Sequence, residues 1–384
     1  MPSWTSPVTD QPAPTDPRLS PVIRVAPAKL NLTLAVTGRS PDGFHALHSV
    51  MVPLVLADRL SIARAHGSTD TLTVSGAGRQ SRGGQPAGQG DRPRGGRPGP
   101  AAPGDPPGWP SIGPVADNLV IRAIALARAA LRGQVEAWPV AARLDKAVPI
   151  AAGLGGGSSD AAATLDAVFS AWGADAAIDA PALARLRADL AARLGSDVPF
   201  FLAGGPAVIT GRGELVEPLP GLRGRAPGIL LVTPRVAAPT PDVFRALDED
   251  PEGRPRDSGS TRLASDHLAV EWRAGMRADA LLMRAGVLAS ANDLAAAADV
   301  VVPGLRALRR SLVRRLARPV GLSGSGPTLW VIYASRDEAE AAGAEVSAGL
   351  ADGSIVAPGA GEPSIIATAL PTATGDHPGE EAST

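Results

Sequence analysis

The chain has 384 residues, of which 44% are hydrophobic, so it is long enough for two domains that each bury a core. Its 37 basic and 38 acidic residues nearly cancel, which argues against nucleic acid or an anionic membrane surface as a partner. Cysteine is absent, which excludes disulfides and cysteine-ligated metals and favours a cytoplasmic location. No stretch approaches the roughly 20 apolar residues of a membrane span. We therefore expect a monomer or homodimer that acts on small molecules.

Four segments have the composition of flexible chain rather than of a packed core. Residues 1–21 and 371–384 are predicted to be disordered tails, and the first of them lacks the pattern of a secretory signal. Residues 76–114 contain 21 Gly or Pro among 39 residues, which predicts a flexible insertion in a surface loop; an anion-binding arm is the alternative. Residues 248–262 are predicted to form a second flexible loop.

Hydrophobic periodicity between these segments predicts strands and helices in alternation. The predicted strands are 22–26, 30–36, 50–56, 60–63, 140–144, 328–334 and 365–370. The predicted helices are 119–131, 158–172, 181–194, 263–272, 278–289, 304–316 and 336–350. A turn is expected at Pro27-Ala-Lys, between the first two strands, and Gly195 is expected to end a helix.

The stretch 149–159 reads Pro-Ile-Ala-Ala-Gly-Leu-Gly-Gly-Gly-Ser-Ser and directly precedes a predicted helix. Glycines let backbone N–H groups approach a ligand closely, and a helix N-terminus attracts anions. The stretch therefore predicts a phosphate-binding loop, although a purely structural glycine turn remains an alternative. It lacks the Gly-Lys-Ser/Thr of a Walker A loop and the Gly-x-Gly-x-x-Gly spacing of a dinucleotide fingerprint.

Lysine and asparagine are rare in this Arg- and Ala-rich chain. The only lysines are Lys29 and Lys146, and the only asparagines are Asn31, Asn118 and Asn292. Lysine and arginine are not interchangeable where a compact ammonium group is needed, so the surviving residues mark candidate functional positions.

Three ordered motifs resemble those of the galactokinase, homoserine kinase, mevalonate kinase and phosphomevalonate kinase (GHMP) superfamily. They are Pro27-Ala-Lys-Leu-Asn-Leu, Gly153-Leu-Gly-Gly-Gly-Ser-Ser-Asp-Ala-Ala and Gly321-Leu-Ser-Gly-Ser-Gly-Pro-Thr. Within the superfamily, three further stretches are similar to the diphosphocytidyl-methylerythritol kinase family. They are Pro41-Asp-Gly-Phe-His, Asp117-Asn-Leu-Val-Ile-Arg-Ala and Leu194-Gly-Ser-Asp-Val-Pro-Phe-Phe. The resemblance spans roughly residues 22–370 apart from the two flexible segments.

The resemblance implies an α+β protein with the two-domain GHMP kinase fold. An ATP-binding domain like ribosomal protein S5 domain 2 would span 22–236, and a ferredoxin-like domain would span 237–370, with the active site between them. The implied activity is ATP-dependent phosphorylation of the 2-hydroxyl of 4-diphosphocytidyl-2-C-methyl-D-erythritol, in the methylerythritol phosphate route to isoprenoid precursors. The alternatives are a GHMP kinase of the homoserine or mevalonate type, and a catalytically silent sensor of the same fold.

The resemblance also assigns roles to residues. Asp197 would be the catalytic base and Lys29 its electrostatic partner; for Asp197, a helix cap after Gly195 is the alternative. The implied ATP-binding residues are Asn118, Lys146, Pro149, Ile150, Ala151, Ala152, Gly153, Leu154, Gly155, Gly156, Gly157, Ser158 and Ser159. Gly324, Ser325 and Gly326 would shape the cleft. Mg²⁺ is expected with the nucleotide, and no sequence cluster has metal-ligand spacing.

The implied acceptor-binding residues are Asn31, Phe44, His45, Asp197 and Thr240. Phe44 occupies a position where the family commonly has Tyr stacked on cytosine, so the aromatic face is kept and the hydroxyl is lost. For Thr240 the alternative is a helix N-cap. His45 and His48 have the spacing of a zinc pair but lack further ligands.

Overall fold

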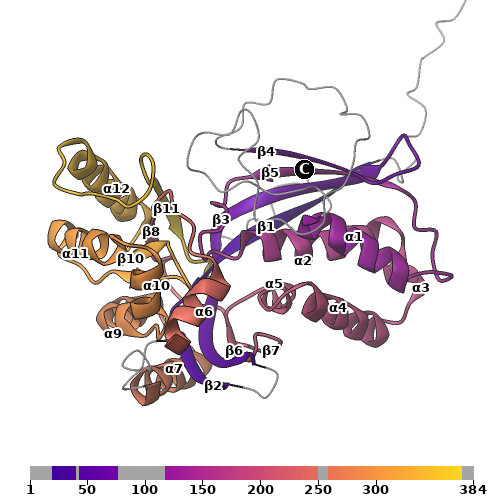
Figure 1. Ribbon diagram of the computed structural model, residues 1–384. Coiled ribbons are helices and arrows are strands. Elements are labelled where there is room, and N and C mark those ends of the chain that lie inside the picture. Colours follow the sequence, from indigo (N-terminus) through magenta and orange to yellow (C-terminus); the bar gives the residue numbers. More distant parts are fainter. Residues whose placement is uncertain (1–19, 40–42, 77–116, 250–257, 374–384) are drawn as a thin grey trace, which may run out of the picture.

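The computed structural model describes residues 20–39, 43–76, 117–249 and 258–373 (Figure 1). The strands are β1 (Val22–Asn31), β2 (Ala35–Arg39), β3 (His45–Arg64), β4 (Thr71–Gly76), β5 (Val140–Lys146), β6 (Ala207–Gly211), β7 (Leu215–Pro218), β8 (Gly228–Thr233), β9 (Gly321–Leu322), β10 (Leu329–Tyr333) and β11 (Ser364–Ala369). The helices are α1 (Leu119–Ala130), α2 (Gly156–Ala171), α3 (Ala174–Ala177), α4 (Ala180–Leu194), α5 (Val198–Ala203), α6 (Thr240–Glu249), α7 (Ser258–Arg273), α8 (Ala278–Met283), α9 (Ala285–Ser290), α10 (Ala295–Val301), α11 (Leu305–Leu316) and α12 (Arg336–Ala351).

The first sheet is organised around β3, a single strand of 20 residues where the sequence predicted two short ones. β1 and β5 pair with the same part of β3 and therefore occupy its two edges, while β2 and β6 pair with its first half. Helices α1 and α2 cover one face of this sheet (Figure 1). Their buried side chains, such as Ile124 and Phe169, join Leu60 and Ile62 of β3 in one core.

The expected turn at Pro27-Ala-Lys is wrong, because β1 runs through these residues. The register of β1 against β3 shifts between Pro27 and Lys29, which is a β-bulge. At the bulge the backbone N–H of Lys29 donates to the carbonyl oxygen of Leu154 (2.9 Å). A proline lacks the N–H that a sheet ladder needs, so a bulge beside Pro27 is a natural place for the strand to change register.

The second sheet has the strand order β11-β8-β10-β9, with all pairs antiparallel. Helices separate β8 from β9 and β10 from β11, which gives the ferredoxin-like βαββαβ arrangement predicted for the C-terminal part. β8 belongs to this sheet although it precedes the predicted boundary at residue 236. We therefore propose a domain boundary between β7 and β8.

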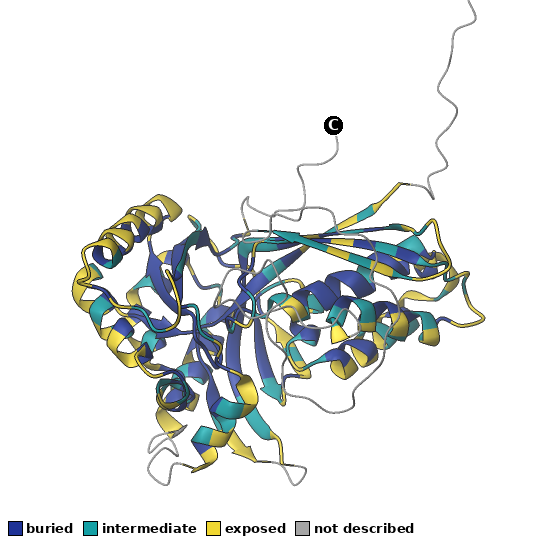
Figure 2. Cartoon of the chain, turned by 45° about the horizontal axis from the view of Figure 1, so that its top comes forward, coloured by how far each residue is buried: buried dark blue, intermediate teal, exposed yellow. Residues whose placement is uncertain are grey.

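A shared core joins the two sheets (Figure 2). It contains Leu30 and Leu54 of the first sheet, Ile229 and Trp330 of the second, and Trp272 of α7, all fully or almost fully buried. Helix α7 also packs against β2 and β3. Burial of this size fixes the two halves relative to one another and hence the walls of any cleft between them.

Some boundary predictions need correction. Asp248 and Glu249 end α6 and residues 258–262 begin α7, so the ends of the predicted loop 248–262 are helical. The predicted helix 278–289 is divided into α8 and α9, and residues 371–373, assigned to a tail, are ordered by a bridge between Thr372 and Leu222. Residues 1–19, 77–116, 250–257 and 374–384 lie outside the described residues. Within the described part, no helix is long and apolar enough to span a membrane.

Arg128 of α1 forms a bidentate ion pair with Asp70 in the loop before β4. Its guanidinium donates to both carboxylate oxygens of Asp70, at 2.5 and 2.7 Å, and lies over the ring of Trp172. The same carboxylate accepts the backbone N–H of Val140 (2.8 Å). Burial opposes the charge of Asp70, but these hydrogen bonds outweigh it and hold the pKa of Asp70 below its ordinary value of 3.8.

Asp70→Asn should lower the free energy of unfolding at pH 7 by about 1.5–3 kcal/mol, because a hydrogen-bonded carboxylate is lost. The contribution of Asp70 is fully present above its unfolded-state pKa and disappears as pH falls through its lowered folded-state pKa. The difference between the two proteins should therefore shrink on acidification below about pH 4. Urea unfolding at several pH values measures this, and a pH-independent difference would contradict the assignment.

Candidate active site

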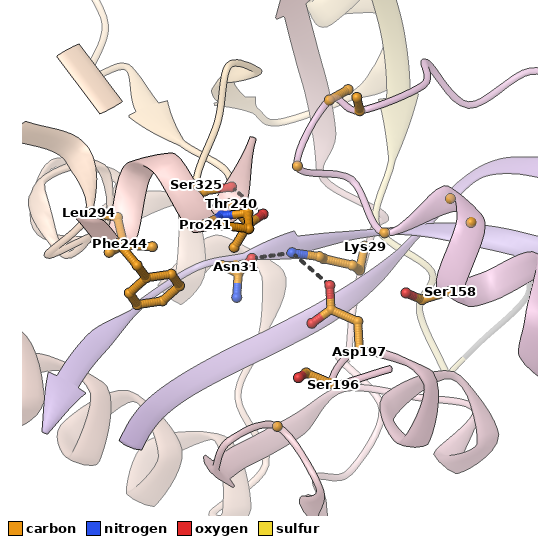
Figure 3. A pocket seen from close by; sticks show the side chains of 18 of the residues that line it. Lys29, Asn31, Ser158, Ser196, Asp197, Thr240, Pro241, Phe244, Leu294 and Ser325 are labelled. Atoms are coloured by element: carbon orange, nitrogen blue, oxygen red, sulfur yellow. Dashed lines mark hydrogen bonds and ion pairs between the residues drawn. The ribbon is translucent and has the colours of Figure 1, made fainter. Parts of the chain in front are cut away.

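A cleft of about 950 Å³ lies where β1, β3, the glycine-rich loop, α6 and the loop after β9 meet (Figure 3). Every predicted site residue lines it except Leu154, Ser159 and Gly326. Leu154 is buried in the shared core, and Ser159 is buried in the first turn of α2 with its hydroxyl unpartnered. Gly326 is buried behind Gly153, whose would-be Cβ lies 2.8 Å from the Gly326 carbonyl oxygen. Sequence reasoning therefore predicted this cavity but extended it to three residues that do not line it.

Lys29 occupies the centre of the cleft, directly after the bulge in β1. Its ammonium group is buried, donates to Asn31 Oδ1 (2.6 Å) and lies 3.6 Å from Asp197 Oδ2 (Figure 3). Asn31 in turn donates from Nδ2 to Ser49 Oγ (2.9 Å). A buried charge needs such partners because desolvation costs far more than a single hydrogen bond returns. Asn31, predicted to bind the acceptor, thus also holds Lys29.

Asp197 precedes α5, yet its side chain makes no capping hydrogen bond. Asp197 thus occupies the N-cap position of α5, as the alternative interpretation expected, but its carboxylate does not cap the helix. Its carboxylate is 38% exposed and points to Lys29 instead. The arrangement provides an accessible carboxylate beside a buried cation, which suits proton abstraction from a bound hydroxyl.

The glycine-rich loop approaches Lys29 so closely that side chains would not fit. Gly155, the N-cap of α2, has a φ of 68°, and a Cβ there would come within 2.8 Å of Lys29 Cγ and 2.9 Å of Phe201 Cζ. Gly153 has a φ of 75° and packs against the backbone carbonyls of Ser323 and Gly326. No side chain caps α2, so the backbone N–H groups of its first residues, which line the cleft, remain available to bind an anion.

Lys146 reaches the cleft, but its ammonium is already engaged. It forms ion pairs with the buried carboxylates of Asp58 and, at 2.7 Å, Asp160. Burial opposes its charge, yet the two carboxylates outweigh burial and raise the pKa of Lys146; burial also raises the pKa of Asp160. Lys146, the last residue of β5, therefore links β3 to the N-terminal part of α2. Asn118, the other residue predicted near the nucleotide base, caps α1 by accepting the N–H of Val120 (2.9 Å).

The far end of the cleft is aromatic. The ring of His45 stacks on Phe244 of α6, with centroids 4.6 Å apart, and His45 Nε2 lies 2.8 Å from Asp248 Oδ1. Phe44 is 56% exposed, with the guanidinium of Arg212 5.0 Å from its ring centroid. Phe44 is therefore a surface of the cleft and not core.

Sequence reasoning missed three of these residues, namely Phe244, Asp248 and Arg212. Phe244 lies one helical turn after Thr240, so its position in Thr-Pro-Asp-Val-Phe was the available signal. Thr240 lies at the start of α6, and its hydroxyl pairs with Ser325 Oγ (3.0 Å).

The zinc alternative for His45 and His48 is wrong. His45 pairs with Asp248, whereas His48 bonds to Ser265 and Asp266. Among the residues that the structure describes, no three His, Cys, Asp or Glu side chains gather as a metal site would require.

Known proteins resemble this chain over most of its length. Residues 118–205 match the GHMP kinases N terminal domain, and residues 273–352 match the GHMP kinases C terminal domain. The chain is 36% identical to the 4-diphosphocytidyl-2-C-methyl-D-erythritol kinase of Rhizobium meliloti, over 84% of this chain and 90% of the relative. It is 35% identical to the enzyme of that name from Rhodococcus jostii, over 85% and 88%. A crystal structure of 4-(cytidine 5'-diphospho)-2C-methyl-D-erythritol kinase superposes with a TM-score of 0.58 at 28% identity, covering 91% of this chain and 99% of that one.

Gly155→Ala should lower turnover at least about 10-fold, because the new Cβ would displace Lys29 or Phe201. Gly173→Ala is the matched control: Gly173 also caps a helix with a left-handed φ, of 72°, but has open space around its would-be Cβ. Both variants should lose about 1 kcal/mol of stability from backbone strain, and only Gly155→Ala should lose activity. Equal turnover in the two would show that the close approach is not needed. Steady-state rates and thermal melts measure both effects.

Proposed function

We propose that this chain transfers the γ-phosphoryl group of ATP to the 2-hydroxyl of 4-diphosphocytidyl-2-C-methyl-D-erythritol. The proposal starts from the fact that the chain belongs to the 4-diphosphocytidyl-2-C-methyl-D-erythritol kinase family of the GHMP kinases. The chain is thus an ATP-dependent small-molecule kinase of the methylerythritol phosphate route to isoprenoid precursors. The observation that carries the proposal is the Lys29–Asp197 pair, held between an anion-binding loop and an aromatic end of one cleft.

Phosphoryl transfer requires positioning, charge stabilisation and a group that takes the hydroxyl proton. Asp197 accepts the proton of the acceptor hydroxyl while the hydroxyl oxygen forms a bond to the γ-phosphorus of ATP. The bond between the γ-phosphorus and the β-phosphate oxygen breaks at the same time and releases ADP. Lys29 is close enough to both Asp197 and the loop to stabilise the negative charge that develops on the reacting oxygens. Gly324 also lines the cleft next to Lys29, since a Cβ at this position would lie 3.2 Å from Lys29 Nζ.

The nucleotide phosphates would bind along Gly153–Ser158, on the free N–H groups at the start of α2. Mg²⁺ neutralises phosphate charge when it is bound with ATP. Residues 20–39, 43–76, 117–249 and 258–373 form no all-protein cluster for it, but hydroxyl oxygens suit the ion, and Ser158 presents one to the cleft. Mg²⁺ would therefore be held mainly by the phosphates, with Ser158 as the protein's contribution.

The acceptor's cytosine would bind at the aromatic end. Phe44 offers an exposed ring, and Phe244 and His45 form a stacked pair that lines the same cleft. Asp248 beside His45 Nε2 favours the tautomer in which this nitrogen carries the proton, which leaves Nδ1 as an acceptor for an amino group. Arg212 adds positive charge where a diphosphate would pass.

Asp197→Asn should reduce turnover about 10² to 10⁴-fold with the KM for ATP little changed, because the amide is nearly isosteric but cannot accept the proton. The assay is coupled ADP release with 4-diphosphocytidyl-2-C-methyl-D-erythritol and ATP. Asp175→Asn, which makes the same change at an exposed carboxylate paired with Arg187, is the control and should be neutral. Near-normal turnover of Asp197→Asn would remove Asp197 from the mechanism, and good ligand binding without ADP release by the wild type would favour a silent sensor.

Phe44→Ala should raise the acceptor KM roughly 5- to 150-fold, because the stacking of one base on an aromatic ring is lost. The KM for ATP should remain nearly unchanged. Its melting temperature should fall little because the ring is exposed. Leu215→Ala removes an equally exposed apolar side chain, on β7 outside the cleft, and should change neither KM. An unaltered acceptor KM for Phe44→Ala would rule out cytosine stacking on this ring.

A further inference from the structure

A chain of buried polar groups runs from Lys29 away from the cleft. Lys29 donates to Asn31 Oδ1, Asn31 Nδ2 donates to Ser49 Oγ, and Ser49 Oγ donates to the backbone carbonyl of Thr33 (2.5 Å). Ser49 has a single hydroxyl hydrogen, and this hydrogen is already donated to the carbonyl oxygen of Thr33. The Ser49 oxygen therefore faces Asn31 as an acceptor, which fixes the Asn31 amide with its oxygen toward Lys29.

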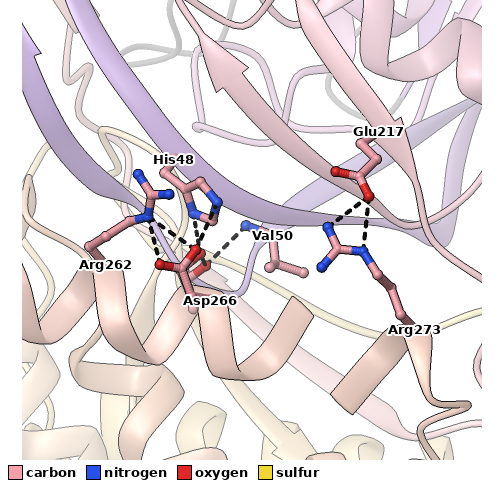
Figure 4. A network of polar contacts seen from close by, with 8 residues as sticks. His48, Val50, Glu217, Arg262, Asp266 and Arg273 are labelled. Atoms are coloured by element: carbon pink, nitrogen blue, oxygen red, sulfur yellow. Dashed lines mark hydrogen bonds and ion pairs between the residues drawn. The ribbon is translucent and has the colours of Figure 1, made fainter. Parts of the chain in front are cut away.

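Thr33 itself is held by side chains from another part of the fold. It lies in the link between β1 and β2, outside both strands. Its hydroxyl accepts the N–H of Val50 (3.0 Å) and lies 2.7 Å from Ser265 Oγ of α7. Ser265 Oγ lies 2.9 Å from His48 Nδ1, and His48 Nε2 lies 3.3 Å from Asp266 Oδ1 (Figure 4).

One arrangement of hydrogens satisfies both hydroxyl groups in this part of the chain. With His48 neutral and protonated on Nε2, Ser265 donates to Nδ1 and Thr33 donates to Ser265, while the Nε2 nitrogen lies 3.3 Å from the Asp266 carboxylate. The surroundings favour the neutral form. Burial lowers the pKa of His48 below 6.5, as do Arg262 and Arg273, against the opposing charges of Asp266 and Glu217 (Figure 4).

Each of the groups between Lys29 and Asp266 is buried, so none can exchange its partner for water without local opening. Ser265 is fully buried, and Thr33 and Ser49 are 1% and 2% exposed. An unsatisfied buried donor or acceptor is costly, so the loss of one link forces its neighbours to reorient. The hydroxyl and the carbonyl of Thr33 belong to one residue, so a shift of Thr33 that begins at α7 also moves the carbonyl that holds Ser49, and with it the Asn31 amide.

We propose that Thr33, Ser265 and His48 are positioning residues that hold Asn31, and through it the ammonium group of Lys29, in the reactive geometry. The proposal rests on the role of Lys29 in the proposed function. It makes α7, which does not line the cleft, part of the apparatus for phosphoryl transfer. Displacement of a catalytic group by about 1 Å can cost roughly 100-fold in rate, so a partial loss of alignment should be measurable.

The decisive comparison is Thr33→Val against Thr368→Val. Both changes remove a buried threonine hydroxyl that accepts a backbone N–H of β3, from Val50 and Leu56 respectively, but only Thr33 belongs to the chain that ends at Lys29. We expect Thr33→Val to lower kcat about 10-fold with both KM values within about two-fold. Thr33→Ser, which keeps the hydroxyl, should restore kcat to within about three-fold. Thr368→Val should lower the melting temperature similarly and leave kcat unchanged.

Ser265→Ala provides a second break in the chain if Thr33→Val folds poorly, and it should show the same fall in kcat. The changes are also made in a Lys29→Met background, where Thr33→Val should have no further effect on the residual rate because the group it positions is gone. Equal kcat for Thr33→Val, Ser265→Ala and Thr368→Val would overturn the proposal, as would a loss that persists without Lys29. Normal turnover of Lys29→Met would instead refute the role of Lys29, and with it this proposal.

Discussion

The structure of the cleft depends on one buried positive charge, the ammonium group of Lys29. Burying a charge is costly unless it is paired and hydrogen-bonded, so the protein must supply partners in fixed positions. Asn31 comes from the same strand, Asp197 from the turn before α5, and the backbone of Lys29 is tied to Leu154. These three attachments bring together segments that are far apart in the sequence. The bulge in β1 and the absence of a side chain at Gly155 are the local features that make the convergence possible.

The sequence was most informative where chemistry demands particular residues in short order. The glycine-rich loop could be recognised because phosphate binding needs free N–H groups at a helix start. Lys29 stood out because lysine is rare in this chain. Asp197 was found only through its resemblance to family motifs, since a carboxylate after Gly195 is equally compatible with a helix cap. The ferredoxin-like half was predicted from resemblance, and its strand order confirmed that expectation.

The parts that the sequence could not provide are set by contacts between distant residues. Strand pairing decided that Pro27 marks a bulge and not a turn, and that β8 belongs to the second sheet. The stacking of His45 on Phe244 depends on α6 lying against the start of β3, which no local pattern encodes. Lys146 was placed at the nucleotide by resemblance, and only the fold shows that two buried carboxylates hold its ammonium.

The length of β3 has a consequence for which acceptors fit. Its first residue, His45, belongs to the aromatic end of the cleft, and Asp58, near its other end, pairs with Lys146 beside the glycine-rich loop. A paired strand hardly stretches, because its rise per residue is fixed and each residue is tied to its neighbours. Under the proposed function, β3 would therefore set the span between the cytosine of the acceptor and the γ-phosphate. A molecule with the same cytosine but one phosphate instead of two would then bind with its hydroxyl out of reach.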